Sequence, residues 1–480
     1  MDILLKLVDC TRSKHNLTLL YQYNEITFTT TLWYSTVDFH QLESEYGQEY
    51  MEKIYFHILL FHGLKILSLK PTHLDLGKYS KYWTSNLQNI WDLSVEQCLG
   101  QWRYETGNLD YQGAKIIHQN IAPVETFAVT IVPEKTSLLV CNGGGKDSLL
   151  MARMLDDNHI PFDSFSINLH THANPEKLFE MHEQHLYQLK NSPQKIHRQY
   201  IIESFLNSPA AKLHGVENLE VSDIRNYEDL PLAYGMFGIL PIILQDKYTQ
   251  LCYGNEKSAD SEQVKVGSQK INHAWCKSTE CEEVYEEYIQ QEFITNLVVF
   301  SLLKPCSDIL VYRLLSQTVK DNDLKLVYSC NTSPPWCKSC PKCAYVYLSY
   351  MAYLTSEQAN ELEQILNKEN LFDRPDLQLY YRQLMGLEAH NAFECVGEIE
   401  EIKLALEKCL EKGFTGEAIN CYIQEARLER NEYQKLWEKY QQLDLSYQGM
   451  PPKLMEILVE EYHKLEETER EHGGRERKKH

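Results

Sequence analysis

The chain has 480 residues, of which 43% are hydrophobic and 24% are charged, the composition of an ordinary globular protein. This length allows two or three domains, each with its own core. The formal net charge is -21, from 47 Lys and Arg against 68 Asp and Glu. Because a field of that sign repels phosphate backbones, the composition disfavours nucleic acid as a partner.

The sequence predicts neither a membrane span nor a secretion signal. The apolar run from Ile54 to Leu67 is broken by His57, His62 and Lys65, and it falls short of the roughly 18 to 20 apolar residues that a bilayer span needs. The N-terminus turns polar too early for a signal peptide. Fourteen cysteines without such a signal favour reduced thiols, some of them on metal. We therefore expect a cytoplasmic protein without membrane partners.

Residues 1–125 predict an α+β N-terminal domain. Tyr23 to Phe39 is dense in β-branched and aromatic residues, which suit a pleated and half-buried surface. Tyr50 to Lys65 follows with the broad apolar face of a helix. A substrate-binding cap and a plain scaffold fit this composition equally well.

Residues 126–397 predict a second domain around a mostly parallel sheet. A short buried strand at Thr136 to Cys141 leads through glycines into the apolar helix pattern of Leu149 to Leu155. Further strand patterns occur at Phe162 to Leu169 and Leu251 to Tyr253, with helix patterns between. Strands that alternate with helices indicate an α/β fold with helices on both faces of the sheet.

Residues 398–480 predict a helical, charged C-terminal extension. Apolar residues spaced three and four apart run from Ile402 to Leu410. The last stretch, Glu466 to His480, is almost wholly charged. We expect a disordered tail there, because nothing in it offsets the entropy of ordering the chain.

A glycine-rich loop stands between the strand and the helix at the start of the second domain. Glycines let the backbone turn sharply and approach an anion, and the free amides of the following helix then point at that anion. The alternative is a glycine-rich turn before an ordinary helix. The candidate binding residues are Gly143, Gly144, Gly145, Lys146, Asp147 and Ser148.

A cysteine cluster follows later in the same domain. Cys337, Cys340 and Cys343 form two overlapping C-x-x-C units, and Cys330 precedes the first by seven positions. Four thiolates suit tetrahedral zinc, so we predict a structural Zn²⁺ site. An iron–sulfur cluster would use the same ligands, and a set of buried free thiols is the third interpretation.

Three polar segments have compositions that packing does not explain. Tyr253 to Asp260 follows a predicted strand, where an open α/β sheet places its ligands. Asn272 to Glu280 and His390 to Glu398 are similarly polar. Taken singly, such segments are more often turns or surface groups.

The glycine loop resembles the S-G-G-x-D-S loop of the PP-loop ATP pyrophosphatases, with Gly143 in place of the leading serine. In that superfamily ATP is cleaved between its α and β phosphates, which gives a substrate adenylate and pyrophosphate. The resemblance implies a PP-loop domain, also known as adenine nucleotide alpha hydrolase-like, that binds ATP with Mg²⁺.

In combination the motifs resemble those of the MurL-type epimerases, which act on the terminal glutamate of UDP-N-acetylmuramoyl-L-alanyl-L-glutamate in peptidoglycan biosynthesis. The resemblance covers roughly Ile54 to Glu401. The departures from the family pattern are Lys257 for Arg, Ala274 for Gln, Cys276 for Ser, and Asn391-Ala392 for Lys-Pro. The matching segments, in order, are Gly144 to Ser148, Gly254 to Asp260, Asn272 to Ser278, Trp336 to Cys343 and His390 to Gly397.

This resemblance implies an isomerase that adenylates the terminal L-glutamate carboxylate of a UDP-linked muramoyl dipeptide and inverts its α-carbon. Glu256, Asp260 and His273 are then the candidate bases, and the sequence does not choose among them. Lys257 and Lys277 are candidates for stabilising pyrophosphate or the enolate-like charge. The alternatives are a PP-loop ligase or amidotransferase on another carboxylate, and a nucleotide-binding relative without turnover.

Overall fold

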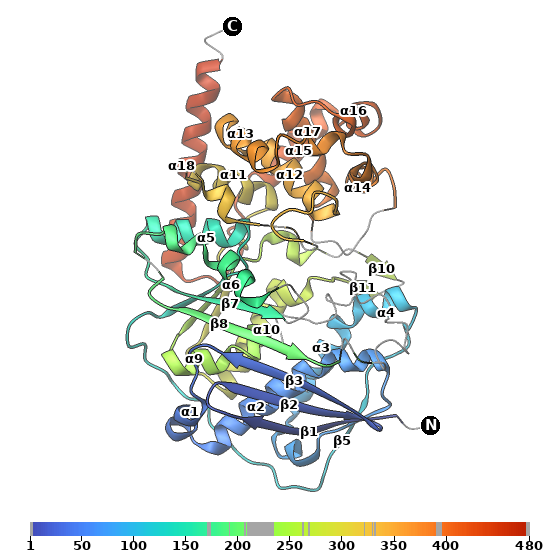
Figure 1. Cartoon of the computed structure of the whole chain (residues 1–480), viewed down its shortest axis with the longest axis vertical. Coiled ribbons are helices and arrows are strands. Elements are labelled where there is room, and N and C mark those ends of the chain that lie inside the picture. Colours follow the sequence, from blue (N-terminus) through green and yellow to red (C-terminus); the bar gives the residue numbers. More distant parts are fainter. Residues whose placement is uncertain are drawn as a thin grey trace.

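The computed structural model describes residues 3–169, 174–191, 193–205, 208, 235–261, 264–266, 269–320, 322–328, 330, 333–389 and 396–476. Within them, ten strands form one continuous sheet in the order β12-β9-β6-β7-β8-β3-β2-β1-β4-β5 (Figure 1). A separate two-stranded sheet pairs β10 with β11. The strands are β1 (Leu4–Arg12), β2 (Asn16–Tyr23), β3 (Ile26–Tyr34), β4 (His73–Asp75), β5 (Lys115–Ile117), β6 (Leu138–Cys141), β7 (Asp163–Leu169), β8 (Ile196–Glu203), β9 (Gln250–Tyr253), β10 (Val264–Val266), β11 (Gln269–Ile271) and β12 (Val298–Ser301).

The large sheet has a parallel half and an antiparallel centre. β12, β9, β6, β7 and β8 are parallel neighbours, whereas β8 pairs antiparallel with β3, and β3, β2 and β1 form an antiparallel meander. β4 and β5 then extend the far edge in parallel with β1. The α/β fold class predicted from the sequence is therefore confirmed.

The predicted N-terminal domain shares this sheet with the second domain. The two meet where β3 pairs with β8, with Thr30 opposite Glu203 and Tyr34 opposite Gln199. Along β2, buried and half-buried residues alternate strictly, as expected for a strand with one face against a core. That core runs without interruption from the N-terminal strands to β9 and β12.

The helices form two groups. Figure 1 shows the helices from Asp308 onward gathered at one end of the molecule and the N-terminal meander at the opposite end, with α9 and α10 beside the sheet. The helices are α1 (Phe39–Tyr46), α2 (Gln48–His62), α3 (Ser85–Cys98), α4 (Gly100–Thr106), α5 (Lys146–Asp157), α6 (Pro175–Glu183), α9 (Leu240–Asp246), α10 (Thr279–Glu292), α11 (Asp308–Thr318), α12 (Pro341–Tyr353), α13 (Ser356–Ile365), α14 (Gln378–Leu384), α15 (Ile399–Glu411), α16 (Glu417–Cys421), α17 (Arg430–Tyr440) and α18 (Pro452–Glu476).

Helix α2 of the N-terminal part holds helix α10 of the second domain. Lys53 forms an ion pair with Glu292 at 2.6 Å, and Nε2 of His57 lies 2.7 Å from the hydroxyl of Tyr288. Burial lowers the pKa of His57 to about 3, so its imidazole is neutral in this contact. The N-terminal domain thus fixes α10, whose first residues follow one of the polar segments.

The C-terminal tail differs from the sequence prediction. Helix α18 continues through Glu466 as far as Glu476, although the composition predicted disorder from Glu466 onward. The guanidinium of Arg313, which is 4% exposed, pairs with Glu469 at 2.7 Å. This distant partner, on α11, supplies contacts that the local composition does not reveal. None of the described helices combines the length and the apolar character needed to span a membrane.

Candidate active site

The site lies at the carboxyl ends of three adjacent parallel strands. β9 pairs with β6 on one side and with β12 on the other, with Cys252 opposite Val140 and Phe300. The chain runs from β6 to β7 and β8 in one direction and then returns to β9 and β12 on the other side. The loops after β6 and β9 therefore meet at a topological switch point, where open α/β sheets bind their ligands.

The glycine loop is held by its own side chains and by His182. The side chain of Asn142 accepts a hydrogen bond from the amide of Gly144 at 2.9 Å and donates one to the carbonyl of His182 at 2.8 Å. The amide of Gly143 donates to Oγ of Ser148 at 3.0 Å. Gly144 has φ +71°, and a Cβ added there would lie 2.8 Å from Cα of His182. Position 144 thus requires glycine.

Gly143 differs from Gly144 in both exposure and surroundings. It is exposed, and a Cβ added to it would meet nothing within 4 Å. The loop therefore presents an open side next to the start of α5. The first amides of a helix have no partner within the helix and carry its positive dipole end, so this side suits an anion.

Lys146 does not point its charge into that open side. Its ammonium is buried and donates to Asp147 at 2.6 Å and to Asp308 at 2.9 Å. Burial opposes the charged form, but the two carboxylates outweigh it and raise the pKa of Lys146 well above its ordinary value. Lys146 is one of the predicted binding residues of the loop, and here two carboxylates compensate its charge.

Asp308 belongs to a buried network that the sequence did not reveal. The hydroxyl of Tyr345 donates to Asp308, and the side-chain carboxyl group of Glu401 accepts from the amide of Asp308 at 3.0 Å. Burial raises the pKa of Asp308, but Lys146 and Tyr345 prevail and hold it below its usual range. Burial and the charge of Asp308 together raise the pKa of Glu401 to about 8. Asp308 starts a helix directly after β12, and this strand–loop–helix pattern was the signal that could have found it.

The loop after β9 packs against the glycine loop. A Cβ on Gly254 would lie 2.8 Å from Cε of Met151 and 3.3 Å from Cβ of Asp147, so the two loops touch. Burial raises the pKa of Asp147, and the nearby charge of Glu256 adds to this shift. Glu256 accepts a hydrogen bond from Ser258 at 2.9 Å. The structure thus brings Glu256 together with the predicted nucleotide loop.

Two buried charged residues join the polar segments to one another. Glu282, on α10, accepts hydrogen bonds from Asn255 at 3.1 Å, from Ser301 at 2.5 Å and from Tyr447 at 2.9 Å. Lys304, after β12, lies 3.6 Å from Glu282. Lys304 also donates to the carbonyl of Lys277 at 2.5 Å and lies 3.8 Å from Asp260. The sequence analysis singled out neither Glu282 nor Lys304.

The remaining candidates occupy the rim of the same region. Lys257 is 53% exposed in its side chain and pairs with Asp444 at 2.5 Å. Asp260 accepts from both the amide, at 2.6 Å, and the hydroxyl, at 2.9 Å, of Thr279, so its carboxylate caps the start of α10. His273 is half-buried in the turn before the short helix η6 (Trp275–Lys277). The motif beginning at His390 lies outside the described residues as far as position 395.

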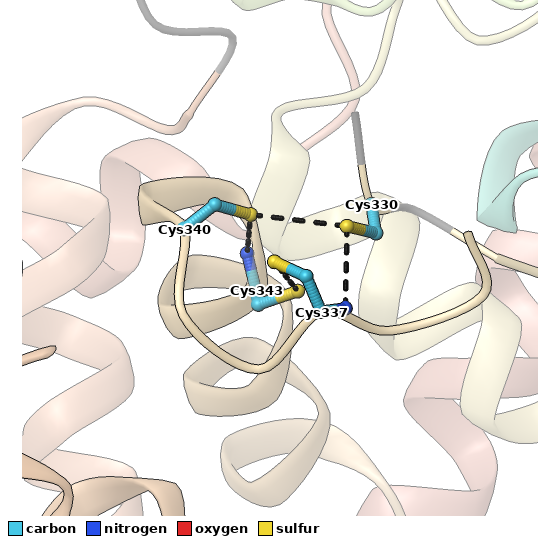
Figure 2. A group of neighbouring side chains, drawn as sticks. All are labelled: Cys330, Cys337, Cys340 and Cys343. Carbon is cyan, nitrogen blue, oxygen red and sulfur yellow. Dashed lines mark hydrogen bonds between the residues drawn. The ribbon is translucent and has the colours of Figure 1, made fainter. Parts of the chain in front are cut away.

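The four cysteines gather at the start of α12, with Cys343 in its first turn (Figure 2). Their sulfur atoms all lie within 4.8 Å of one another, with Cys330 and Cys340 4.0 Å apart and Cys337 and Cys343 3.7 Å apart. Sulfurs at about 2.3 Å from a tetrahedral zinc lie about 3.8 Å from each other, so the spacing fits such an ion. This group could hold a metal such as zinc.

The fold and the site together define an α/β protein with a glycine-rich loop at a sheet switch point and a cluster of four cysteines that could hold a metal. Two family models match the chain. The MurL N-terminal domain matches residues 240–302, and the MurL C-terminal domain matches residues 326–435. The resemblance to MurL-type proteins predicted from the motifs is confirmed over these segments. The glycine loop lies before the first of them.

Curated relatives agree with the family models. The chain is 33% identical over 159 residues to the UDP-N-acetyl-alpha-D-muramoyl-L-alanyl-L-glutamate epimerase of Micromonospora sp., covering 32% of this chain and 34% of that one. The proteins of the same name from Salinispora tropica and Xanthomonas oryzae pv. oryzae are 31% and 30% identical, over 34% and 36% of their lengths. The matches cover 32% and 33% of this chain, respectively, and span about a third of these relatives. No solved structure matches.

Proposed function

We propose that this protein is an ATP-dependent epimerase that inverts the α-carbon of the terminal L-glutamate of UDP-N-acetylmuramoyl-L-alanyl-L-glutamate. One observation carries the proposal. The glycine loop, the loop from Gly254 to Asp260 and the segment from Asn272 to Ser278 converge at one sheet switch point, in a chain that both MurL domain models match.

The chemistry explains why a nucleotide is needed. The α-proton next to a free carboxylate is very weakly acidic, because a carbanion beside that negative charge is poorly stabilised. In the proposed reaction the carboxylate attacks the α-phosphorus of ATP and releases pyrophosphate, which leaves an acyl adenylate without the carboxylate charge. A base then takes the α-proton, a proton returns from the opposite face, and water releases AMP.

The chain's own groups have distinct parts in this scheme. The open side at Gly143 and the first amides of α5 bind the phosphates. Asp147, in the first turn of α5, would orient a water on Mg²⁺, which offsets phosphate charge. Asp260 is engaged in capping α10, so Glu256 and His273 are the better candidates for the base.

We also propose that the cysteine cluster binds zinc. Four thiolates from one compact segment are the ligand set of structural zinc sites. Elemental analysis of the purified protein should find about one zinc per chain, because a site of this kind holds a single ion. A brown protein with strong visible absorption would instead identify an iron–sulfur cluster.

Deuterium incorporation tests the epimerase directly. Incubated in heavy water with ATP, magnesium and the L-glutamate-ended substrate, the protein should place deuterium at the α-carbon and yield the D form. Without ATP, no exchange should occur. Replacing Glu256 by Gln or His273 by Asn should identify the base, if exchange stops while pyrophosphate release continues.

A ligase on another carboxylate is the rival within the same chemistry. In that enzyme, pyrophosphate is released but an amine attacks the adenylate, and the α-proton never exchanges. Pyrophosphate release without deuterium incorporation would therefore replace the epimerase by the ligase. A protein that binds ATP and never releases pyrophosphate would be a nucleotide-binding relative.

A further inference from the structure

We propose that metal binding at the four cysteines and nucleotide binding at the glycine loop are coupled through Tyr328 and Tyr345. These two tyrosines flank the cysteine set, two residues before Cys330 and two residues after Cys343. The inference rests on the proposed function, because it takes ATP as the ligand of the loop.

Tyr328 supports the glycine loop from the N-terminal side of the cysteines. Its amide donates to the carbonyl of Gly144 at 3.2 Å. Its ring stacks on His182 with the centroids 5.8 Å apart, and its hydroxyl lies 2.5 Å from Nε2 of His182. A Cβ added to Gly145 would lie 3.3 Å from the carbonyl oxygen of Tyr328. Backbone and ring of Tyr328 therefore form one wall of the loop.

Tyr345 reaches the same loop from the C-terminal side of the cysteines. It lies on α12, and Cys340 caps the start of this helix by accepting from the amide of Cys343 at 3.4 Å. The hydroxyl of Tyr345 donates to Asp308, and the other carboxylate oxygen of Asp308 accepts from Lys146 at 2.9 Å. Helix α12 is thereby linked to the first residue of α5.

A shared metal ion would tie the four cysteines together. Metal binding displaces the thiol protons, and a single ion then bonds four sulfur atoms that already lie within 4.8 Å of one another. Without the ion, only a weak contact between thiols links Cys330 to Cys340, and the segments that carry Tyr328 and Tyr345 are held less firmly. The two walls of the loop would loosen together.

Coupling of this kind is reciprocal. If the metal orders the loop for the nucleotide, the nucleotide must raise the affinity for the metal by the same factor. A cluster that leaves the glycine loop equally folded with and without its metal predicts no such effect, because the nucleotide would then not distinguish the metal-bound form from the metal-free form.

The test measures the apparent zinc affinity of the full chain by competition with a chromogenic chelator, with and without a non-hydrolysable ATP analogue. Direct binding of the analogue is measured on the same samples. We expect the analogue to raise the zinc affinity at least about fivefold, the lower end of ordinary coupling between sites. Tyr345→Phe and Tyr328→Phe should reduce this factor.

Tyr347→Phe is the matched control. Tyr347 is also buried on α12, and its hydroxyl donates to Asn370 at 3.2 Å, away from the loop. This variant should retain the full coupling factor. An equal loss in Tyr347→Phe would show that general loosening of α12 explains the effect, and would overturn the role of Tyr345.

The two proposals fail in different ways. If the analogue binds and the zinc affinity does not change, the coupling is wrong while the nucleotide site stands. If the chain binds the analogue but no zinc, the coupling is equally wrong. If the analogue does not bind to the zinc-loaded protein, the proposed ATP-dependent function itself falls, and the coupling falls with it.

Discussion

The ammonium of Lys304 lies 3.6 Å from the carboxylate of Glu282, and each side chain is only 2% exposed. This pair joins three stretches of chain, because Glu282 accepts from Asn255 and Lys304 donates to the carbonyl of Lys277. The buried pair of Lys304 and Glu282 thus holds the two polar segments at the switch point together. Tyr447, from beyond the matched family models, completes the group by donating to Glu282.

Removing one partner of this buried pair should cost much more than removing an exposed one. Lys304→Met leaves the Glu282 carboxylate without its cation, and we expect a loss of about 3 kcal/mol in the free energy of unfolding. Lys257→Met breaks the pair of Lys257, which is 53% exposed, with Asp444 and should cost about 1 kcal/mol or less. Urea unfolding of both variants measures the difference. Equal losses in the two variants would mean that burial does not increase the contribution of Lys304 to stability.

The features of the site that the sequence revealed are those coded locally. The glycine loop and its flanking strand and helix occupy consecutive residues, and the four cysteines fall between Cys330 and Cys343. Glu282, Lys304 and Asp308 were missed because their partners lie far away in the chain. Lys146 pairs with Asp308 across 162 residues, for example, and no local pattern marks such a pairing.

The same distinction explains the tail. Its composition predicted disorder, since entropy dominates where no apolar face can be buried. Helix α18 nevertheless continues past Leu465, which is buried, and Glu469 pairs with Arg313 on another helix. The order of the strands in the sheet could not be predicted from the sequence either, because β3 and β8 become neighbours only in the folded chain.

Replacement by alanine should destabilise the protein at one of two adjacent glycines and not at the other. Gly144→Ala forces a β-carbon into a left-handed position and to within 2.8 Å of the His182 backbone, so the melting temperature should fall clearly. Gly143→Ala adds its β-carbon in open space and should leave the melting temperature nearly unchanged. If Gly143→Ala nevertheless loses nucleotide binding, the open side of the loop is where the nucleotide sits. A stable Gly144→Ala variant would contradict the loop geometry.

Two truncations of different length should differ in their effect on the free energy of unfolding. Removing 466–480 deletes Glu469 and leaves the guanidinium of Arg313 without its carboxylate partner. We therefore expect the free energy of unfolding to fall by about 1 to 3 kcal/mol. Removing only 473–480 keeps that pair and should cost little. Chemical unfolding of the two truncated chains gives the comparison. A harmless longer deletion would show that the pair does not stabilise the fold.

The buried carboxyl group of Glu401 predicts a stability that declines with pH. Its pKa is raised from 4.5 to about 8, so the folded protein holds a proton on Glu401 that the unfolded chain loses above pH 4.5. The stability from this group is fully present below pH 4.5 and is lost as the pH rises through about 8. Asp308, which faces Glu401, has a lowered pKa and titrates below this window.

Glu401→Gln keeps the shape of the protonated acid and cannot ionise, so it should remove this decline. As the pH rises from 5 to 9, the free energy of unfolding of the variant should increase relative to that of the parent protein. The increase should be on the order of 1.4 kcal/mol per unit of pKa shift. Glu456→Gln, at an exposed position on α18, is the control and should follow the parent at every pH. Parallel curves for Glu401→Gln and the parent would show that Glu401 is ionised in the folded protein throughout this range.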